Sequence, residues 1–167
     1  MEYNFRLSEL TPDNIDDLYE VYEFSQQHNF TFAAAPHLQG VKANPSLQKD
    51  TQYADFFSFL IKEKGNFKRK IFGTKLYLEY MRDLKKFICK PLTMLVVSPE
   101  GNVFYPCLEK GNYADNILQN VNLHDILKKG KENFGPIPKC DTRCHSACAL
   151  GFSLLVEHTL KNGTRQI

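Results

Sequence analysis

The sequence lacks any run of the ~20 apolar residues that a membrane-spanning helix needs. Its first residues, 1–6, contain no apolar stretch of the kind found in a signal peptide. An excess of one charge is also missing, because 21 basic and 19 acidic side chains leave a formal net charge of +2. These absences argue against membrane insertion, and the balanced charge gives no basic field for nucleic acid. We therefore expect a cytoplasmic protein, in which thiols stay reduced.

The first part of the chain predicts a strand–helix–strand unit. Residues 3–7 alternate apolar with polar side chains, which is typical of a strand. Thr11 and Pro12 suit the start of a helix, and apolar residues recur on one face of it through about His28. The apolar run 30–35, ended by Pro36, predicts a buried strand. This order is typical of a parallel sheet, so the expected fold class is α/β.

Further elements follow after a polar loop over residues 36–50. One helix is expected over residues 53–61, stopped by Gly65, and another begins near Thr74. Residues 93–98 and 103–105 then predict the two strands of a β-hairpin, joined by the turn residues 99–102. A fourth helix is expected from about Asn122, and the last from about Asp141 to near Leu160.

The predicted hairpin is expected to bring two of the five cysteines together. If its turn centres on Glu100, facing residues have numbers that sum to about 200, as in any antiparallel hairpin. Thr93 then faces Cys107, and Cys89 lies four residues before Thr93. We therefore expect both thiols at the open end of one hairpin.

The other three cysteines, Cys140, Cys144 and Cys148, have the form C-x3-C-x3-C. Residues four apart share a helix face, and the positive start of a helix favours thiolates. Four or five sulfur ligands suit an iron–sulfur cluster or tetrahedral zinc, and ordinary buried cysteines explain this spacing poorly. Cys148 is the least certain ligand because it lies furthest along the helix. His145 would point away from the helix face of Cys144 and Cys148, so it ranks behind the thiols.

The spacing of Cys89, Gly101 and Cys107, C-x11-G-x5-C, resembles the pattern C-x(9–15)-G-x4-C with one residue more after the glycine; that pattern opens the SPASM/twitch domain of radical S-adenosylmethionine (radical SAM) proteins. Residues 116–118 and 123–127 are similar to the segment that those proteins place after the hairpin. The resemblance implies an auxiliary [4Fe–4S] cluster, used for electron transfer or substrate anchoring in an oxidoreductase. It implies ligands among Cys89, Cys107, Cys140, Cys144 and Cys148.

The same resemblance implies two domains. Residues 1–88 would be the last strand–helix units of a radical SAM-like partial (β/α) barrel, and residues 89–167 the cluster-binding domain with its hairpin and helix. The radical SAM motif C-x3-C-x2-C is absent from the sequence. We therefore expect no cleavage of S-adenosylmethionine by this chain alone, and binding of that cofactor only if a missing N-terminal half is supplied. Such a half, or a second copy, is the expected partner.

Two other interpretations stay open. A structural zinc module would use the same thiolates without redox activity. A thiol redox protein using Cys144 and Cys148 would need a C-x-x-C motif at a helix start, which is missing. His37 and Gln39 are weak candidates for substrate or cofactor contact, since they follow a predicted parallel strand whose carboxyl end is a usual ligand site. The sequence does not select a substrate.

Overall fold

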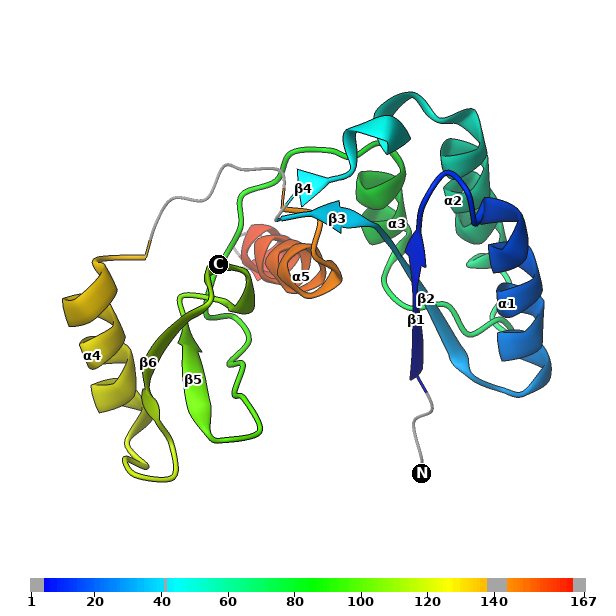
Figure 1. Cartoon of the computed structure of the whole chain (residues 1–167). Helices are drawn as coiled ribbons and strands as arrows, with labels where there is room; N and C mark the ends of the chain where they lie inside the picture. The colour runs from blue at the N-terminus through cyan, green and yellow to red at the C-terminus, as the bar shows by residue number, and fades with distance from the viewer. Residues whose placement is uncertain (1–4, 41, 138–143, 164–167) are drawn as a thin grey trace. The chain divides into compact units, whose positions relative to one another are not determined.

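The computed structural model describes residues 5–40, 42–137 and 144–163. The chain divides into two compact units. Unit 1 comprises Met1–Phe87 and Thr142–Gly151, and unit 2 comprises Ile88–Asp141 and Phe152–Ile167. The fold is mixed α/β, as expected, and the described residues form three two-stranded sheets (Figure 1). None of the helices in the described ranges combines the length and the apolar character that a membrane crossing requires.

Unit 1 begins with the predicted parallel strand–helix–strand arrangement. β1 (Phe5–Leu10) pairs in parallel with β2 (Thr31–Pro36), and α1 (Ile15–Gln27) connects them. The second edge of β2 is partly covered, because Phe32 forms a parallel bridge with Ile71. The backbone N–H of Phe32 donates to the Lys70 carbonyl and its carbonyl accepts from Phe72, both at 2.8 Å. A third segment of chain therefore extends this small sheet.

The predicted start of α1 is wrong by a few residues. Thr11 does not cap the helix, which begins at Ile15. The side chain of Asn14 instead accepts a hydrogen bond from the Thr11 backbone N–H at 2.9 Å, and the Asn14 N–H donates back to the Thr11 carbonyl at 3.3 Å. These two bonds close a turn that separates β1 from the helix.

The two helices that follow begin where the sequence predicts. Asp50 caps α2 (Thr51–Glu63) by accepting from the Tyr53 N–H at 3.0 Å. Thr74 caps α3 (Lys75–Arg82) by accepting from the Tyr77 N–H at 3.1 Å. The predicted polar loop 36–50 is more structured than expected. It holds β3 (Leu38–Gln39), β4 (Lys42–Ala43) and a 3-10 helix (Pro45–Lys49).

The core of unit 1 is aromatic. Tyr22 of α1, Phe32 of β2 and Phe56 of α2 are fully buried. The rings of Tyr22 and Phe32 meet edge to face at 5.4 Å, and those of Phe32 and Phe56 at 6.2 Å. Such pairs add about 0.5–1.5 kcal/mol each beyond the area that they bury. The apolar faces predicted for these helices therefore pack on β2.

Unit 2 contains a second sheet covered by a helix. β5 (Asn102–Tyr105) pairs antiparallel with β6 (Asn112–Asn116), and α4 (Leu123–Phe134) packs against both. Asn122 caps α4 by accepting from the His124 N–H at 3.1 Å, close to the predicted start. The buried residues of this core are Val103, Tyr105, Ala114 and Ile126.

The predicted turn 99–102 forms, but the strand before it does not. The Gly101 N–H donates to the Ser98 carbonyl at 2.9 Å, and Gly101 adopts φ +87°, as in a turn followed by a glycine bulge. Val97 and Val103 form an antiparallel bridge, and their numbers give the expected register. Val96 and Ser98 each keep one backbone hydrogen bond to β5, at 3.0 and 2.8 Å, and residues 93–95 lie outside any strand. The segment 93–95 is half exposed and forms no pairing with a described strand.

Candidate functional site

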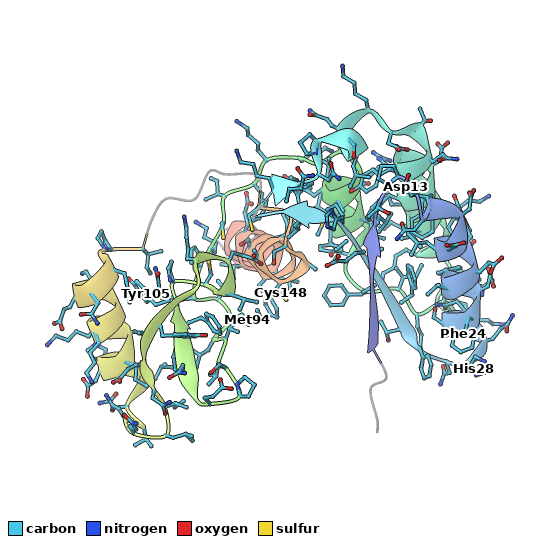
Figure 2. The ribbon with its side chains drawn as sticks, viewed as in Figure 1. Asp13, Phe24, His28, Met94, Tyr105 and Cys148 are labelled. Atoms are coloured by element: carbon cyan, nitrogen blue, oxygen red, sulfur yellow. The ribbon has the colours of Figure 1, made fainter. Side chains whose placement is uncertain are left out.

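The C-terminal cysteines do not share one helix face as predicted. α5 (Ala147–Gly163) begins six residues after the expected Asp141. Cys144 is not helical, because its backbone forms an antiparallel bridge with Lys42 of β4. Cys144 is buried, whereas Cys148 is exposed in the first turn of α5 (Figure 2). The third member, Cys140, lies outside the described residues.

The low rank of His145 depends on a helix through Cys144, and that helix is wrong, because the backbone of Cys144 pairs with Lys42 of β4. His145 is 1% exposed and follows Cys144 directly. A buried imidazole is a possible metal ligand, so His145 remains a candidate beside the thiols.

The structure brings the loop of His37 and Gln39 to the same part of unit 1 as Cys144. Gln39 pairs with Lys42 in the β3–β4 hairpin, and Lys42 in turn bridges Cys144. Gln39 is exposed. His37 is half-buried, and its Nδ1 is buried with no hydrogen-bond partner among the described residues. Its backbone is fixed, since its N–H donates to the Leu10 carbonyl at 2.9 Å. His37 is therefore the stronger of these two weak candidates.

Tyr77 of α3 also lies near the start of α5. The sequence predicted only that it lies on the apolar face of a helix, and it did not mark Tyr77 as a candidate site residue. Tyr77 is 2% exposed, and its hydroxyl has no hydrogen-bond partner within the described part of the chain. Burial raises the pKa of the Tyr77 phenol above its usual range, and the Cys148 thiolate adds to the rise. Its ring lies 3.9 Å from where a Cβ on Gly151 would stand, one turn beyond Cys148 on α5. The phenol therefore faces the start of α5.

Cys89 and Cys107 both belong to unit 2 and are half-buried. The hairpin pairing that was expected to align Cys89 with Cys107 ends at the hydrogen bond from the Phe104 N–H to the Val96 carbonyl. Residues 90–93 form a turn with Leu92 at φ +64°, so Thr93 does not pair opposite Cys107. Cys107 follows a cis peptide bond between Tyr105 and Pro106. The predicted pairing of Thr93 with Cys107, from which we expected Cys89 and Cys107 to lie close together, is therefore wrong.

Metal binding is not decided by these positions. Within residues 5–40, 42–137 and 144–163, no three histidine, cysteine, aspartate or glutamate side chains are grouped as metal ligands. Cys140 is not among these residues, so the set of three C-terminal thiols is incomplete. The metal site stays a prediction. The chain matches no protein-family model, no curated protein and no solved structure.

Proposed function

We propose that this chain binds a thiolate-ligated metal centre, most simply a [4Fe–4S] cluster. The observation that carries the proposal is the local structure of residues 144–148. Cys144 is buried beside β4, and Cys148 stands in the first turn of α5. The positive end of a helix stabilises a thiolate, which is the form that binds metal. Soft sulfur donors favour iron–sulfur clusters or zinc over hard oxygen-binding cations.

The ligands in this proposal come from Cys89, Cys107, Cys140, Cys144 and Cys148, of which Cys148 stays the least certain. This rank rests on the sequence, which placed Cys148 furthest along the helix; in the structure it is exposed in the first turn of α5, whereas Cys144 is buried. A bound cluster would supply electron transfer or hold a substrate in place. The protein would then work in a reducing compartment such as the cytoplasm.

We further propose that the chain is the C-terminal portion of a radical SAM family oxidoreductase. Two features support this. The parallel β1–α1–β2 unit with its bridge to Ile71 is the repeat from which partial (β/α) barrels are built. The glycine turn at Gly101 lies between Cys89 and Cys107, as in a SPASM/twitch hairpin. S-adenosylmethionine would require the missing C-x3-C-x2-C motif, supplied by an N-terminal half as partner; a second copy of this chain is the other proposed partner.

The test is anaerobic reconstitution of the purified chain with iron and sulfide, followed by metal analysis and absorption spectroscopy. We expect about four iron and four sulfide per chain with broad visible absorption. Cys144→Ser should lose the cluster, and the matched control Ser146→Ala, two residues away and without a thiol, should keep it. Retention of a full cluster in Cys144→Ser would contradict the proposal.

Zinc is the second candidate, and the burial of His145 favours it. Zinc accepts mixed imidazole and thiolate ligands in tetrahedral sites. In that case the protein purified with metal would be colourless and carry about one zinc per chain. His145→Ala would then reduce zinc content, whereas it would leave an all-cysteine cluster intact.

A further inference from the structure

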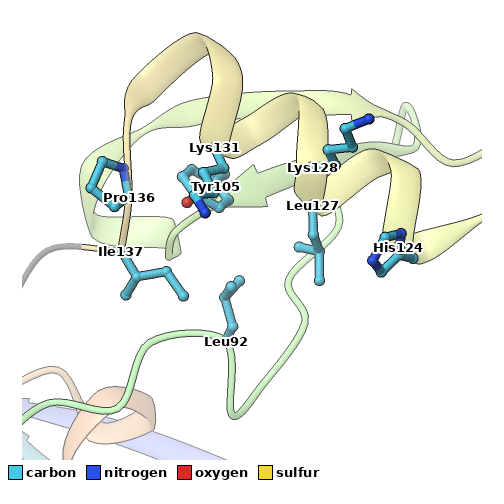
Figure 3. Close-up of a pocket in the computed structure, with 8 residues that line it drawn as sticks. All are labelled: Leu92, Tyr105, His124, Leu127, Lys128, Lys131, Pro136 and Ile137. Carbon is cyan, nitrogen blue, oxygen red and sulfur yellow. The ribbon is translucent and has the colours of Figure 1, made fainter.

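Unit 2 has a pocket that neither the cysteines nor the predicted hairpin accounts for. It has a volume of about 460 Å³ and lies beneath α4 (Figure 3). That volume is within the range of about 300–1,000 Å³ that is typical of small-molecule sites. All of its lining residues belong to unit 2, so the pocket is a property of that unit.

The inner wall of the pocket is apolar and held in place. Leu92 and Leu127 point toward one another across it, and Ile137 closes one end (Figure 3). Both leucines pack on the core of unit 2. The ring of Tyr105 is 2% exposed, and its hydroxyl donates to the Gly135 carbonyl at 3.0 Å. A wall anchored to the core in this way exists before any ligand binds, which lowers the entropic cost of binding.

The rim of the pocket is basic. His124, Lys128 and Lys131 lie on one face of α4 at spacings of four and three residues, and all three line the pocket. None of the described residues that line it carries a carboxylate. Lys128 is 3.9 Å from Glu132, a weak exposed pair, and Lys131 has no ion pair among the described residues. Lys129, by contrast, is neutralised by Asp115 at 2.6 Å.

We propose that this pocket binds a small organic anion with an apolar body, of the medium-chain carboxylate type. The hydrocarbon would lie between Leu92, Leu127 and Ile137, and the carboxylate would meet Lys128 and Lys131. Charge complementarity selects an anion over a cation or a neutral ligand, because the wall is apolar and Lys131 has no ion pair among the described residues. The Lys128–Glu132 and His124–Asp125 pairs, at 3.9 and 3.8 Å, are exposed and weak. The proposal is independent of the metal centre.

The test measures displacement of the fluorescent anion 8-anilinonaphthalene-1-sulfonate from the full chain by decanoate. Decyltrimethylammonium, whose alkyl chain is only one carbon longer and whose charge is opposite, is the ligand control. The Lys128→Glu/Lys131→Glu variant should bind decanoate about tenfold more weakly, since two screened charge interactions are reversed. The Lys86→Glu/Lys110→Glu variant has the same net charge but alters exposed lysines outside the pocket, and it should change binding by less than about twofold.

A second pair of variants tests the apolar wall. Ile137→Ser should weaken decanoate binding, and Val121→Ser, which changes an exposed residue outside the pocket, should not. Ile137 is 46% exposed and Val121 is 87% exposed, so neither change should unfold the protein. Equal displacement by decanoate and by decyltrimethylammonium would overturn the proposal, as would equal losses in the two lysine variants. Failure of decanoate to bind, or binding only of an acidic peptide, would overturn it as well.

Discussion

Two buried tyrosines of unit 1 allow a direct test of whether a buried hydroxyl stabilises the protein only when it is hydrogen-bonded. Tyr53 and Tyr77 are 1% and 2% exposed, so their phenol rings bury nearly equal area. The Tyr53 hydroxyl donates to the Met81 carbonyl at 2.7 Å. The Tyr77 hydroxyl has no such partner among the described residues. Tyr53→Phe therefore measures the loss of a buried hydrogen bond, and Tyr77→Phe measures the removal of a buried polar group that has no partner among the described residues.

The expected effects have opposite signs. Tyr53→Phe should lower the free energy of unfolding by about 1 kcal/mol, the usual net contribution of a buried hydrogen bond. The loss should stay near that value, because the Met81 carbonyl still accepts from the Leu84 N–H at 3.2 Å. Tyr77→Phe should leave the free energy of unfolding unchanged or raise it by about 1 kcal/mol, because a buried hydroxyl without a partner carries a desolvation cost.

The measurement is urea unfolding of the apo protein, with the midpoint and slope compared between wild type and the two variants. Equal slopes would show that the difference is one of stability alone. A loss of 1 kcal/mol or more in Tyr77→Phe, about as large as in Tyr53→Phe, would refute the reasoning. It would mean that the Tyr77 hydroxyl makes a stabilising hydrogen bond.

Three further substitutions have defined outcomes. Gly130→Ala should destabilise unit 2 by about 1–3 kcal/mol despite the better helix propensity of alanine, because the new Cβ would stand 2.6 Å from the Tyr105 ring; thermal unfolding checks this. Asp50→Ala should cost about 1 kcal/mol in the same assay by removing the cap of α2. Hydrogen bonds from Arg82 and then Lys85 lower the pKa of Asp83 from 3.8 to about 2, against the effect of burial. The resulting stabilisation is complete above the unfolded pKa of 3.8 and is lost as pH falls toward 2. In Asp83→Asn, the free energy of unfolding measured by urea should therefore fall less steeply between pH 3.8 and pH 2 than in wild type. The pKa shift of Asp83 could contribute at most about 2.4 kcal/mol to the free energy of unfolding. Because this side chain is 32% exposed, solvent screening reduces the contribution to about 1 kcal/mol.

Local hydrogen bonds explain which parts of the fold the sequence predicted well. Asp50, Thr74 and Asn122 each cap a helix through a backbone N–H two or three residues away. A bond of such short range depends on the neighbouring residues alone, so the sequence around it is sufficient. The turn at Gly101 is of the same kind, because its hydrogen bond to Ser98 and its positive φ are local.

Apart from the start of α1, where a local turn between Thr11 and Asn14 was missed, pairings between distant segments explain the failures. Residues 93–98 have strand-like composition, yet only residues 96–98 pair with β5, and the longer pairing of β5 is with β6. Propensity measures how well a side chain fits a sheet, and it does not say which strand will be the neighbour. For the same reason, the bridge between Ile71 and β2 could not be predicted from the sequence.

The candidate site shows the same division. The sequence by itself determined the spacing of the cysteines, their chemical suitability for a soft metal and the parallel strand–helix–strand order, since these follow from residue type and short-range periodicity. Only the tertiary structure decided that Cys144 joins β4 rather than α5, that His145 is buried and that the Tyr77 phenol faces the start of α5. It also placed the basic face of α4 over an apolar wall. Each of these depends on burial or on backbone pairing between segments far apart in the chain, and local sequence carries no record of either.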